Sequence, residues 1–419
     1  MYRTTAVLFL LLIAAVNTGT VWHFCETFTW DRFSTFRHQL SGTAKEVRTS
    51  TAADGKDSPQ RQQEHQLQVF FNKIQRSPLK RYGVQAESVL NASTAENRWL
   101  INLFGFLQKA MGKNMVDNAG SYICKRPNGN LVYGHIRKKQ ISDKNTPETL
   151  RKNLRPVCDL FRKLQRQNTP YLYILSPERI PPDTCEILPG IVNHVNESMD
   201  AQVQVLQENG VPVLDLRSEF RKHTQNWDDL FFHTDHHWQV PSGFLAAAQI
   251  IRIIKDTLKL PEDRVLFLTD IQNYETITEP KSFLGSLGTR TGETYCGLDD
   301  FVYYVPKFTT HLKRSAVKRG GEPKLFEGTF QECLVFPSRK KFFRYDDTYF
   351  DGNIGYQTID NAEGSGSVLV IHNSMAQAVL PFFALHFRHL VCIDPRYSYT
   401  KTIDELLQEE HFDYVITLY

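Results

Sequence analysis

The side chains best suited to chemistry are concentrated in residues 234–238, which read Thr-Asp-His-His-Trp. Residues two positions apart in an extended loop point to the same side, so the Asp235 carboxylate can accept the Nδ1–H of His237. That contact leaves Nε2 of His237 free to act as a base. Two other interpretations stay open: a metal site made of His233, Asp235 and His237, or a histidine-rich loop satisfied by backbone hydrogen bonds.

A candidate nucleophile, Ser374, lies much further along the chain. Residues 366–375 (GSVLVIHNSM) predict a strand, a tight turn and a helix, so Ser374 stands at a helix N-terminus and at the carboxyl end of a strand. Active sites of open α/β sheets form at that edge. The N–H groups of the first helical turn would stabilise an oxyanion there. The alternative is that Ser374 only caps its helix.

Strands and helices alternate through the body of the chain. Continuous apolar strands separated by helices are typical of a parallel sheet covered on both faces. Residues 262–365 differ, with many Gly, Thr, Tyr and Phe, and predict an inserted region rich in strands or loops beside the sheet. The predicted strands are 171–176, 211–216, 368–371, 390–393 and 414–418, and the predicted helices are 99–111, 199–208, 244–254, 375–387 and 402–410.

The N-terminal part has a different character. Residues 6–16 are an apolar run that follows Arg3, which is typical of a secretory signal; an uncleaved anchor and a buried helix of a cytosolic protein are the alternatives. Residues 40–67 contain almost no large apolar side chains and therefore read as a tether. We expect a signal peptide or anchor at 1–24, a polar tether with some helix at 25–94, and one folded domain at 95–419.

Composition excludes several classes of protein. The 419 residues include 49 Lys and Arg against 46 Asp and Glu, a net charge of +3, which argues against a dedicated nucleic-acid binder. Ten of those cations lie between residues 307 and 344, where they predict either a surface for an anionic glycan or lipid or an ordinary solvated face. The seven cysteines form no C-x-x-C pair, so neither a zinc ribbon nor a thioredoxin motif is indicated. If the protein is exported, some of these cysteines could form disulfides.

Residues 234–238 resemble the signature of the bacterial DHHW proteins, which are similar to the SGNH-hydrolase-like domain of periplasmic alginate O-acetyltransferases. The resemblance covers roughly residues 95 to 419, and the ordered set of matching blocks is more specific than any single block. The further blocks are residues 176–179, 188–189, 211–217, 283–292, 299–300, 306–308 and 371–397.

The resemblance implies an SGNH-hydrolase-like, flavodoxin-like parallel sheet with helices on both faces and a Ser-His-Asp triad. Asp235 would orient His237, which would act as the base, and Ser374 would attack an acyl group. Relatives typically read Gly-Asp-Ser where this chain reads His372-Asn373-Ser374, so the turn is bulkier and lacks one carboxylate.

Three further residues are candidates for the substrate-binding site. Gly285 would let a backbone N–H approach the oxyanion, or would only make a turn. Arg396 would face the pocket rim, or would form an exposed salt bridge. Trp238 would stack on a sugar, or would pack behind the loop that contains the three histidines, residues 233–237, called the histidine loop below.

Together these observations predict an exported acyltransferase, with acetyl the expected group, acting on a cell-surface or secreted polysaccharide. A carbohydrate esterase and a non-catalytic glycan-binding envelope protein of the same fold are the alternatives. We expect no cofactor and no metal. The predicted partners are a glycan acceptor and a membrane-bound acyltransferase that supplies acyl groups, with membrane contact through the N-terminal segment if it is uncleaved.

Overall fold

A computed structural model describes most of the chain beyond residue 97, and residues 91–419 form one compact unit. The predicted signal segment 1–24 and tether 25–94 lie outside the described residues. Among the described residues, no helix is both long and apolar enough to cross a bilayer. The described ranges are 98–118, 121–135, 146–184, 186–318, 321–336, 348–352, 354–398 and 401–419.

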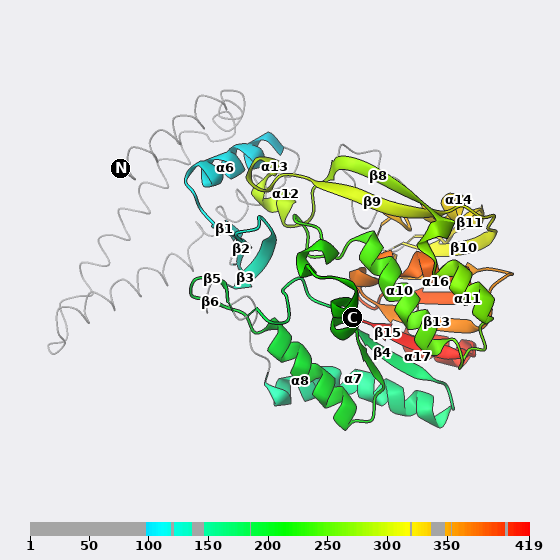
Figure 1. The fold of residues 1–419 in the computed structure, drawn as a ribbon. Coiled ribbons are helices and arrows are strands. Elements are labelled where there is room, and N and C mark those ends of the chain that lie inside the picture. The colour runs from blue at the N-terminus through cyan, green and yellow to red at the C-terminus, as the bar shows by residue number, and fades with distance from the viewer. Residues whose placement is uncertain are drawn as a thin grey trace, which may run out of the picture. The chain divides into compact units, whose positions relative to one another are not determined.

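An eight-stranded sheet with the order β11-β10-β12-β14-β13-β15-β4-β7 forms the centre of the fold (Figure 1). Its last five strands are parallel, as the alternating pattern predicted. They read as apolar runs because most of their residues are buried on both faces of the sheet. These strands are β4 (Tyr171–Leu175), β7 (Val213–Asp215), β13 (Ser367–His372), β14 (His389–Ile393) and β15 (Tyr414–Leu418).

The inserted region extends this sheet and does not stand beside it. Strands β10 (Leu312–Val317), β11 (Lys324–Gly328) and β12 (Tyr356–Asp360) join the edge at β14 in antiparallel register, so the sheet is mixed. The rest of the region includes an antiparallel hairpin of β8 (Tyr274–Phe283) and β9 (Asp299–Pro306).

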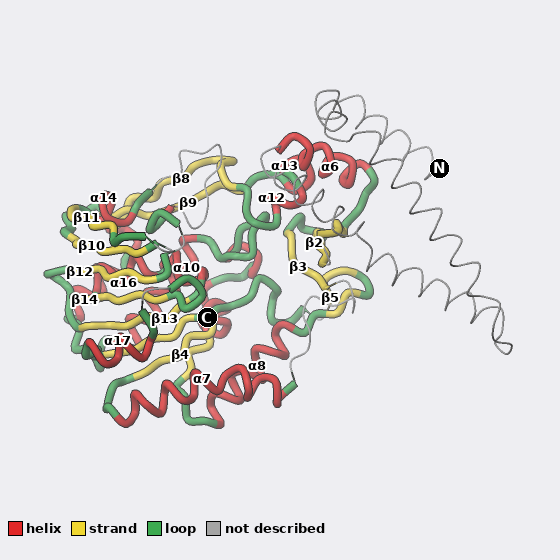
Figure 2. Tube along the Cα trace, turned by 180° about the vertical axis from the view of Figure 1, so that it is seen from behind, coloured by secondary structure: helices red, strands yellow, loops and turns green. Residues whose placement is uncertain are grey.

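Helices cover both faces of the sheet (Figure 2). Alternate strand residues point to opposite faces, which divides the core into two clusters. Helices α10 (Val240–Ile254), α11 (Glu262–Leu268) and α16 (Leu380–His386) pack on one face. Helices α7 (Pro147–Arg166), α8 (Val195–Glu208) and α17 (Ile403–Glu409) pack on the other.

Smaller elements surround the sheet. They include the predicted amphipathic helix α6 (Arg98–Ala110) and the three-stranded sheet β1-β2-β3. The remaining bounds are β1 (Met115–Asn118), β2 (Ser121–Lys125), β3 (Leu131–His135), β5 (Glu186–Leu188), β6 (Ile191–Val192), α9 (Leu216–His223), η3 (Trp227–Leu230), η4 (Ile271–Asn273), α12 (Gly288–Thr291), α13 (Glu293–Cys296) and α14 (Phe330–Leu334).

One predicted helix is divided. Residues 375–387 form a short 3₁₀-helix, η5 (Ser374–Ala378), and then α16, which has Pro381 in its first turn. Proline has no N–H to donate and its ring clashes with the carbonyl group four residues earlier, so Pro381 disfavours a regular helix that continues from Met375, although α7 tolerates Pro156 in its interior. The candidate nucleophile Ser374 is therefore the first residue of a five-residue 3₁₀-helix and does not begin a long α-helix.

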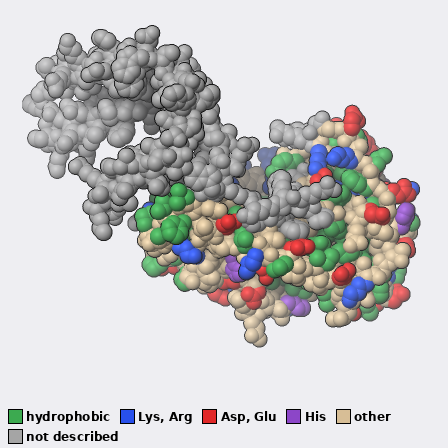
Figure 3. Space-filling model, turned by 90° about the horizontal axis from the view of Figure 1, so that it is seen from above, with side chains coloured by type: hydrophobic (Ala, Val, Ile, Leu, Met, Phe, Trp, Pro, Cys, Tyr) green, Lys and Arg blue, Asp and Glu red, His purple; other side chains and the backbone are tan. Residues whose placement is uncertain are grey.

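The described cations of the basic segment 307–344 do not form one charged surface. Arg314 is buried and donates to Gln357 Oε1 (2.8 Å), Cys333 O (3.1 Å) and Phe350 O (2.8 Å). Lys313 pairs with Glu327. On the face shown in Figure 3, described cations and anions are interspersed. The segment's cations at 319, 339–341 and 344 lie outside the described residues.

Five cysteines are described, and all five are free thiols: Cys124, Cys158, Cys296, Cys333 and Cys392. Burial raises the pKa of the Cys124 thiol to about 11. Cys25 and Cys185 lie outside the described residues, so the predicted oxidation is not observed among the thiols that the structure describes.

Replacing Arg314 tests its structural role. Arg314→Met keeps an unbranched side chain but leaves three buried acceptors without their donor, so we expect the free energy of unfolding to fall by about 3 kcal/mol. The measurement is urea denaturation. Lys313→Ala is the matched control and should cost less than about 1 kcal/mol, because its ion pair is exposed. Equal losses would contradict the assignment.

Candidate active site

His237 lies between Asp235 and Ser374 and contacts both. Its Nδ1 is 2.6 Å from Asp235 Oδ1, and its Nε2 is 2.9 Å from Ser374 Oγ. An ionised carboxylate can only accept, so Nδ1 carries the proton and Nε2 accepts from the serine hydroxyl. Asp235 and His237 belong to the loop before α10, while Ser374 is the first residue of η5. The structure thus brings together the three residues predicted to act on an acyl group.

The Asp235 carboxylate is buried but well supplied with donors. Oδ1 also accepts from the N–H of His237 (2.9 Å), and Oδ2 accepts from the N–H of Ser286 (2.5 Å). Burial by itself raises the pKa of Asp235, but hydrogen bonding and attraction to His237, together with the Ser286 N–H, outweigh it and hold the pKa well below its usual range. Asp235 therefore remains ionised at neutral pH and keeps the Nδ1 proton of His237 in place.

Gly285 supports Asp235 and is not available to an oxyanion. Its N–H donates to Thr234 Oγ1 at 2.8 Å. A Cβ at this position would lie 2.3 Å from Cβ of Asp235 and 2.6 Å from the Thr234 carbonyl oxygen, so only glycine allows this approach. In this arrangement the Gly285 N–H is engaged, and the close approach to Asp235 and Thr234 fits the alternative role of Gly285 in a turn.

Two buried charges fix the histidine loop through its backbone. Asp299 accepts from the N–H of His233 (2.8 Å) and from the N–H (2.9 Å) and Oγ1 (2.6 Å) of Thr234. Arg179 donates to the carbonyl oxygens of His233 and Asp235, and burial lowers its pKa to about 10. Sequence reasoning gave neither residue a role, although both stand in matching blocks, 176–179 and 299–300.

The metal alternative of His233, Asp235 and His237 does not form. Nδ1 of His233 contacts Asp299 at 3.0 Å instead. A different cluster, of Asp235, His236 and His237, places one ligand atom from each residue within 4.8 Å of the others. A metal ion there would compete with the hydrogen bonds that join Asp235 to His237 and His237 to Ser374.

The turn at residues 372–375, which holds the candidate nucleophile and is called the nucleophile turn below, is capped by Asn373 and not by Ser374. Asn373 Oδ1 accepts the N–H of Met375 at 2.9 Å, which leaves the partly exposed Ser374 hydroxyl for His237. The N–H groups of the first helical turn were expected to stabilise an oxyanion, but that of Met375 is already engaged in this hydrogen bond. Within the described residues, no hydrogen bond uses the N–H of Ser374 itself.

Trp238 has a packing role. It is fully buried, packs against the ring of Phe220 with centroids 5.8 Å apart, and donates its Nε1–H to the Met375 carbonyl oxygen at 2.8 Å. The prediction that it stacks on a sugar is wrong because its ring is not exposed. Trp238 instead ties the histidine loop to the nucleophile turn.

Arg396 adopts the salt-bridge alternative. Its Nε and Nη2 donate to the two carboxylate oxygens of Asp394 at 2.9 and 2.7 Å, and its guanidinium lies 5.2 Å from the centre of the Tyr397 ring. The side chain is 45% exposed. The pairing with Asp394 engages the nitrogen atoms Nε and Nη2 of Arg396. The third nitrogen, Nη1, has no hydrogen-bond partner among the described residues.

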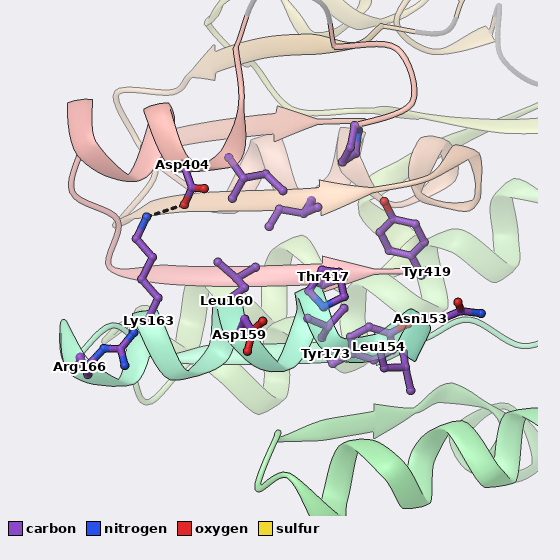
Figure 4. Close-up of a pocket in the computed structure, with 15 residues that line it drawn as sticks. Asn153, Leu154, Asp159, Leu160, Lys163, Arg166, Tyr173, Asp404, Thr417 and Tyr419 are labelled. Atoms are coloured by element: carbon purple, nitrogen blue, oxygen red, sulfur yellow. Dashed lines mark hydrogen bonds and ion pairs between the residues drawn. The ribbon is translucent and has the colours of Figure 1, made fainter. Parts of the chain in front are cut away.

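A cavity of about 720 Å³ lies elsewhere, between α7 and α17 (Figure 4). Its floor is formed by Tyr173, Ile371 and Thr417, and the ion pair of Lys163 and Asp404 (2.6 Å) borders it. Tyr173 and Ile371 belong to the core cluster on the α7 face, whereas Trp238 belongs to the cluster on the α10 face. The cavity therefore lies on the α7 face of the sheet, opposite to the face on which Trp238 packs.

Gly285→Ala tests the close approach to Asp235. Two of the three clashing atoms belong to Asp235 and one to the backbone of Thr234, so relaxation is restricted, and we expect a loss of about 2 kcal/mol in the free energy of unfolding. Chemical denaturation measures it. Gly321→Ala is the control, because its nearest neighbour, the Lys318 carbonyl oxygen, would be 3.5 Å away. If both variants are equally stable, the packing argument fails.

Comparison with known proteins found a matching family model. Residues 136–316 match the model for the SGNH hydrolase-like domain of the acetyltransferase AlgX, a range that includes Asp235 and His237 but not Ser374. No curated protein matches the chain.

Two solved structures share the fold. PatB1 from Bacillus cereus is 19% identical with a TM-score of 0.58, over 71% of this chain and 95% of that chain. A DHHW family protein from Eubacterium siraeum is 16% identical with a TM-score of 0.52, over 73% of this chain and 92% of that chain. The chain therefore has an SGNH-hydrolase-like fold, and residues 136–316 resemble the AlgX acetyltransferase domain, in agreement with the resemblance drawn from the sequence.

Proposed function

We propose that this protein is an extracytoplasmic O-acetyltransferase that modifies a polysaccharide through Ser374, His237 and Asp235. The observation that carries the proposal is the pair of contacts at 2.6 and 2.9 Å that joins the three side chains. The match to an acetyltransferase domain supports the choice of acetyl. The apolar run at residues 6–16 supports export.

In the first half-reaction, His237 Nε2 takes the proton of the Ser374 hydroxyl as Oγ attacks the carbonyl carbon of the acetyl donor. The negative charge that develops on the carbonyl oxygen is stabilised by the N–H of Ser374. The tetrahedral intermediate collapses, and His237 gives the proton to the departing oxygen. Ser374 is left as an acetyl ester.

In the second half-reaction, a hydroxyl of the glycan takes the place of the departed group. His237 removes its proton, the glycan oxygen attacks the acetyl-serine, and Ser374 Oγ recovers the proton from His237. Throughout, ionised Asp235 stabilises the imidazolium that forms on His237. A membrane-bound acyltransferase would supply the acetyl donor, in keeping with the N-terminal apolar segment.

The two alternatives differ from this proposal in the reaction that they imply. An esterase would use water in place of the glycan hydroxyl, with the same residues. A glycan-binding protein would need no reactive serine, and the substituted turn at residues 372–374 is what suggests it. The hydrogen bond from Ser374 to His237 favours an enzyme, because a purely structural serine has no need of an oriented base.

Reaction with a fluorophosphonate probe and with a chromogenic acetate ester tests the catalytic residues. Wild type should label at Ser374 and release acetate. Ser374→Ala and His237→Ala should each lower kcat by at least about 10³-fold, and Asp235→Asn should do so nearly as strongly because the wrong tautomer forms. Ser282→Ala and His389→Ala, away from the site, should retain activity. Full activity in Ser374→Ala would refute the proposal.

Product analysis decides between transfer and hydrolysis. With an acetate ester as donor and a soluble oligosaccharide as acceptor, mass spectrometry should find acetylated oligosaccharide, and the amount should rise with acceptor concentration. The acceptor should also speed consumption of the ester, because it resolves acetyl-Ser374 faster than water does. Acetate as the sole product at every acceptor concentration would assign the protein as an esterase.

A further inference from the structure

His372, the last residue of β13, directs its side chain toward the backbone of the nucleophile turn. It is 1% exposed, and its Nδ1 lies 2.9 Å from the carbonyl oxygen of Asn373. A carbonyl oxygen can only accept, so Nδ1 carries the proton and donates. Nε2 is buried and has no hydrogen-bond partner among the described residues, which leaves it as a bare lone pair. His372 is therefore a neutral donor whose one hydrogen bond goes to this carbonyl.

The carbonyl of Asn373 belongs to the same peptide group as the N–H of Ser374. In a planar trans peptide the C=O and the N–H point in opposite directions. A donor that holds the carbonyl on the buried side therefore turns the N–H away from that side. Hydrogen bonding at the carbonyl also polarises the peptide group and makes its N–H a stronger donor. His372 acts on both properties of this one N–H.

This peptide matters because two other candidate N–H donors, those of Met375 and Gly285, are already engaged. The N–H of Met375 donates to Asn373 Oδ1, and that of Gly285 donates to Thr234 Oγ1. The Asn373 carbonyl has one further described donor, the N–H of Ala376 at 3.2 Å. That bond is longer than the one from His372 and belongs to the 3₁₀-helix.

We propose that His372 is a positioning residue that orients and polarises the Ser374 N–H as the oxyanion donor. The inference rests on the proposed function, since it presupposes attack by Ser374 on an acyl group. It assigns a task to the histidine that replaces the usual glycine of the turn. His372 itself touches no reacting atom.

Two substitutions of nearly equal size separate donation from packing. His372→Asn keeps an N–H donor close to the position of Nδ1, whereas His372→Leu removes it, and both leave similar space where the ring was. His372→Leu should lower kcat for the acetate ester roughly 10- to 100-fold, less than the roughly 10²- to 10³-fold effect of deleting an oxyanion donor outright. KM should stay within about twofold, and His372→Asn should recover most of the loss.

Further measurements exclude a merely structural effect. The rate of fluorophosphonate labelling at Ser374 should fall in His372→Leu in the same proportion as kcat, while the pH dependence of the rate keeps its shape because His237 is unchanged. The two variants should unfold at similar denaturant concentrations. Equal kcat in the Leu and Asn variants, or a loss in KM alone, would overturn this inference and leave the proposed function standing. An inactive wild type, or an active Ser374→Ala, would overturn the proposed function as well.

Discussion

The contact between His237 Nε2 and Ser374 Oγ joins segments 137 residues apart, and the surrounding structure serves to hold its 2.9 Å distance. Ser374 is fixed by β13 in the interior of the sheet, and His237 by the start of α10. Helix α10 meets η5 at Gly243, where a Cβ would lie 2.4 Å from the Cβ of Ala378. The helix can approach η5 so closely because glycine is there. Trp238 then bridges the same two segments through the Met375 carbonyl.

Buried charges give the histidine loop its shape without contacting the reacting atoms. Asp299 and Arg179 bind the N–H and C=O groups of residues 233–235, so a loop with little regular structure has a defined backbone. Burying such ions lowers the stability of the fold unless hydrogen bonds replace their lost hydration. Here most of the hydrogen-bonding groups of Asp299 and Arg179 have partners. Nε of Arg179 remains without a partner among the described residues.

Much of the fold follows from local patterns, and the errors have physical causes. Apolar runs separated by helical segments located the five parallel strands, because burial on both faces leaves a clear signal. The same pattern does not reveal that β10, β11 and β12 join the sheet, since antiparallel pairing at an edge depends on contacts far apart in the chain. The helix after Ser374 was predicted as continuous because its apolar period is regular, yet a new helix begins at Leu380 with Pro381 in its first turn.

The candidate site was predictable in its residue types but not in its hydrogen bonds. Asp235 and His237 are two residues apart, so their contact follows from local geometry. Packing buries Trp238 and engages the N–H groups of Gly285 and Met375. The spacing of residues in the sequence does not predict such contacts. Arg179 and Asp299 act through the backbone of another segment, so their roles appear only once the loop is folded.

The position of β15 constrains how the molecule is made. Residues 414–418 are the last to form a strand, yet β15 lies between β13 and β4, and the turn at Asn373 is held through the carbonyl of Leu418. Until those residues emerge during synthesis, the facing edges of β13 and β4 have no partner, and both are apolar. Folding is therefore dominated by pairings distant in sequence, which are slow to form and expose strands that can aggregate. During synthesis these two strand edges therefore stay exposed until β15 pairs with both of them.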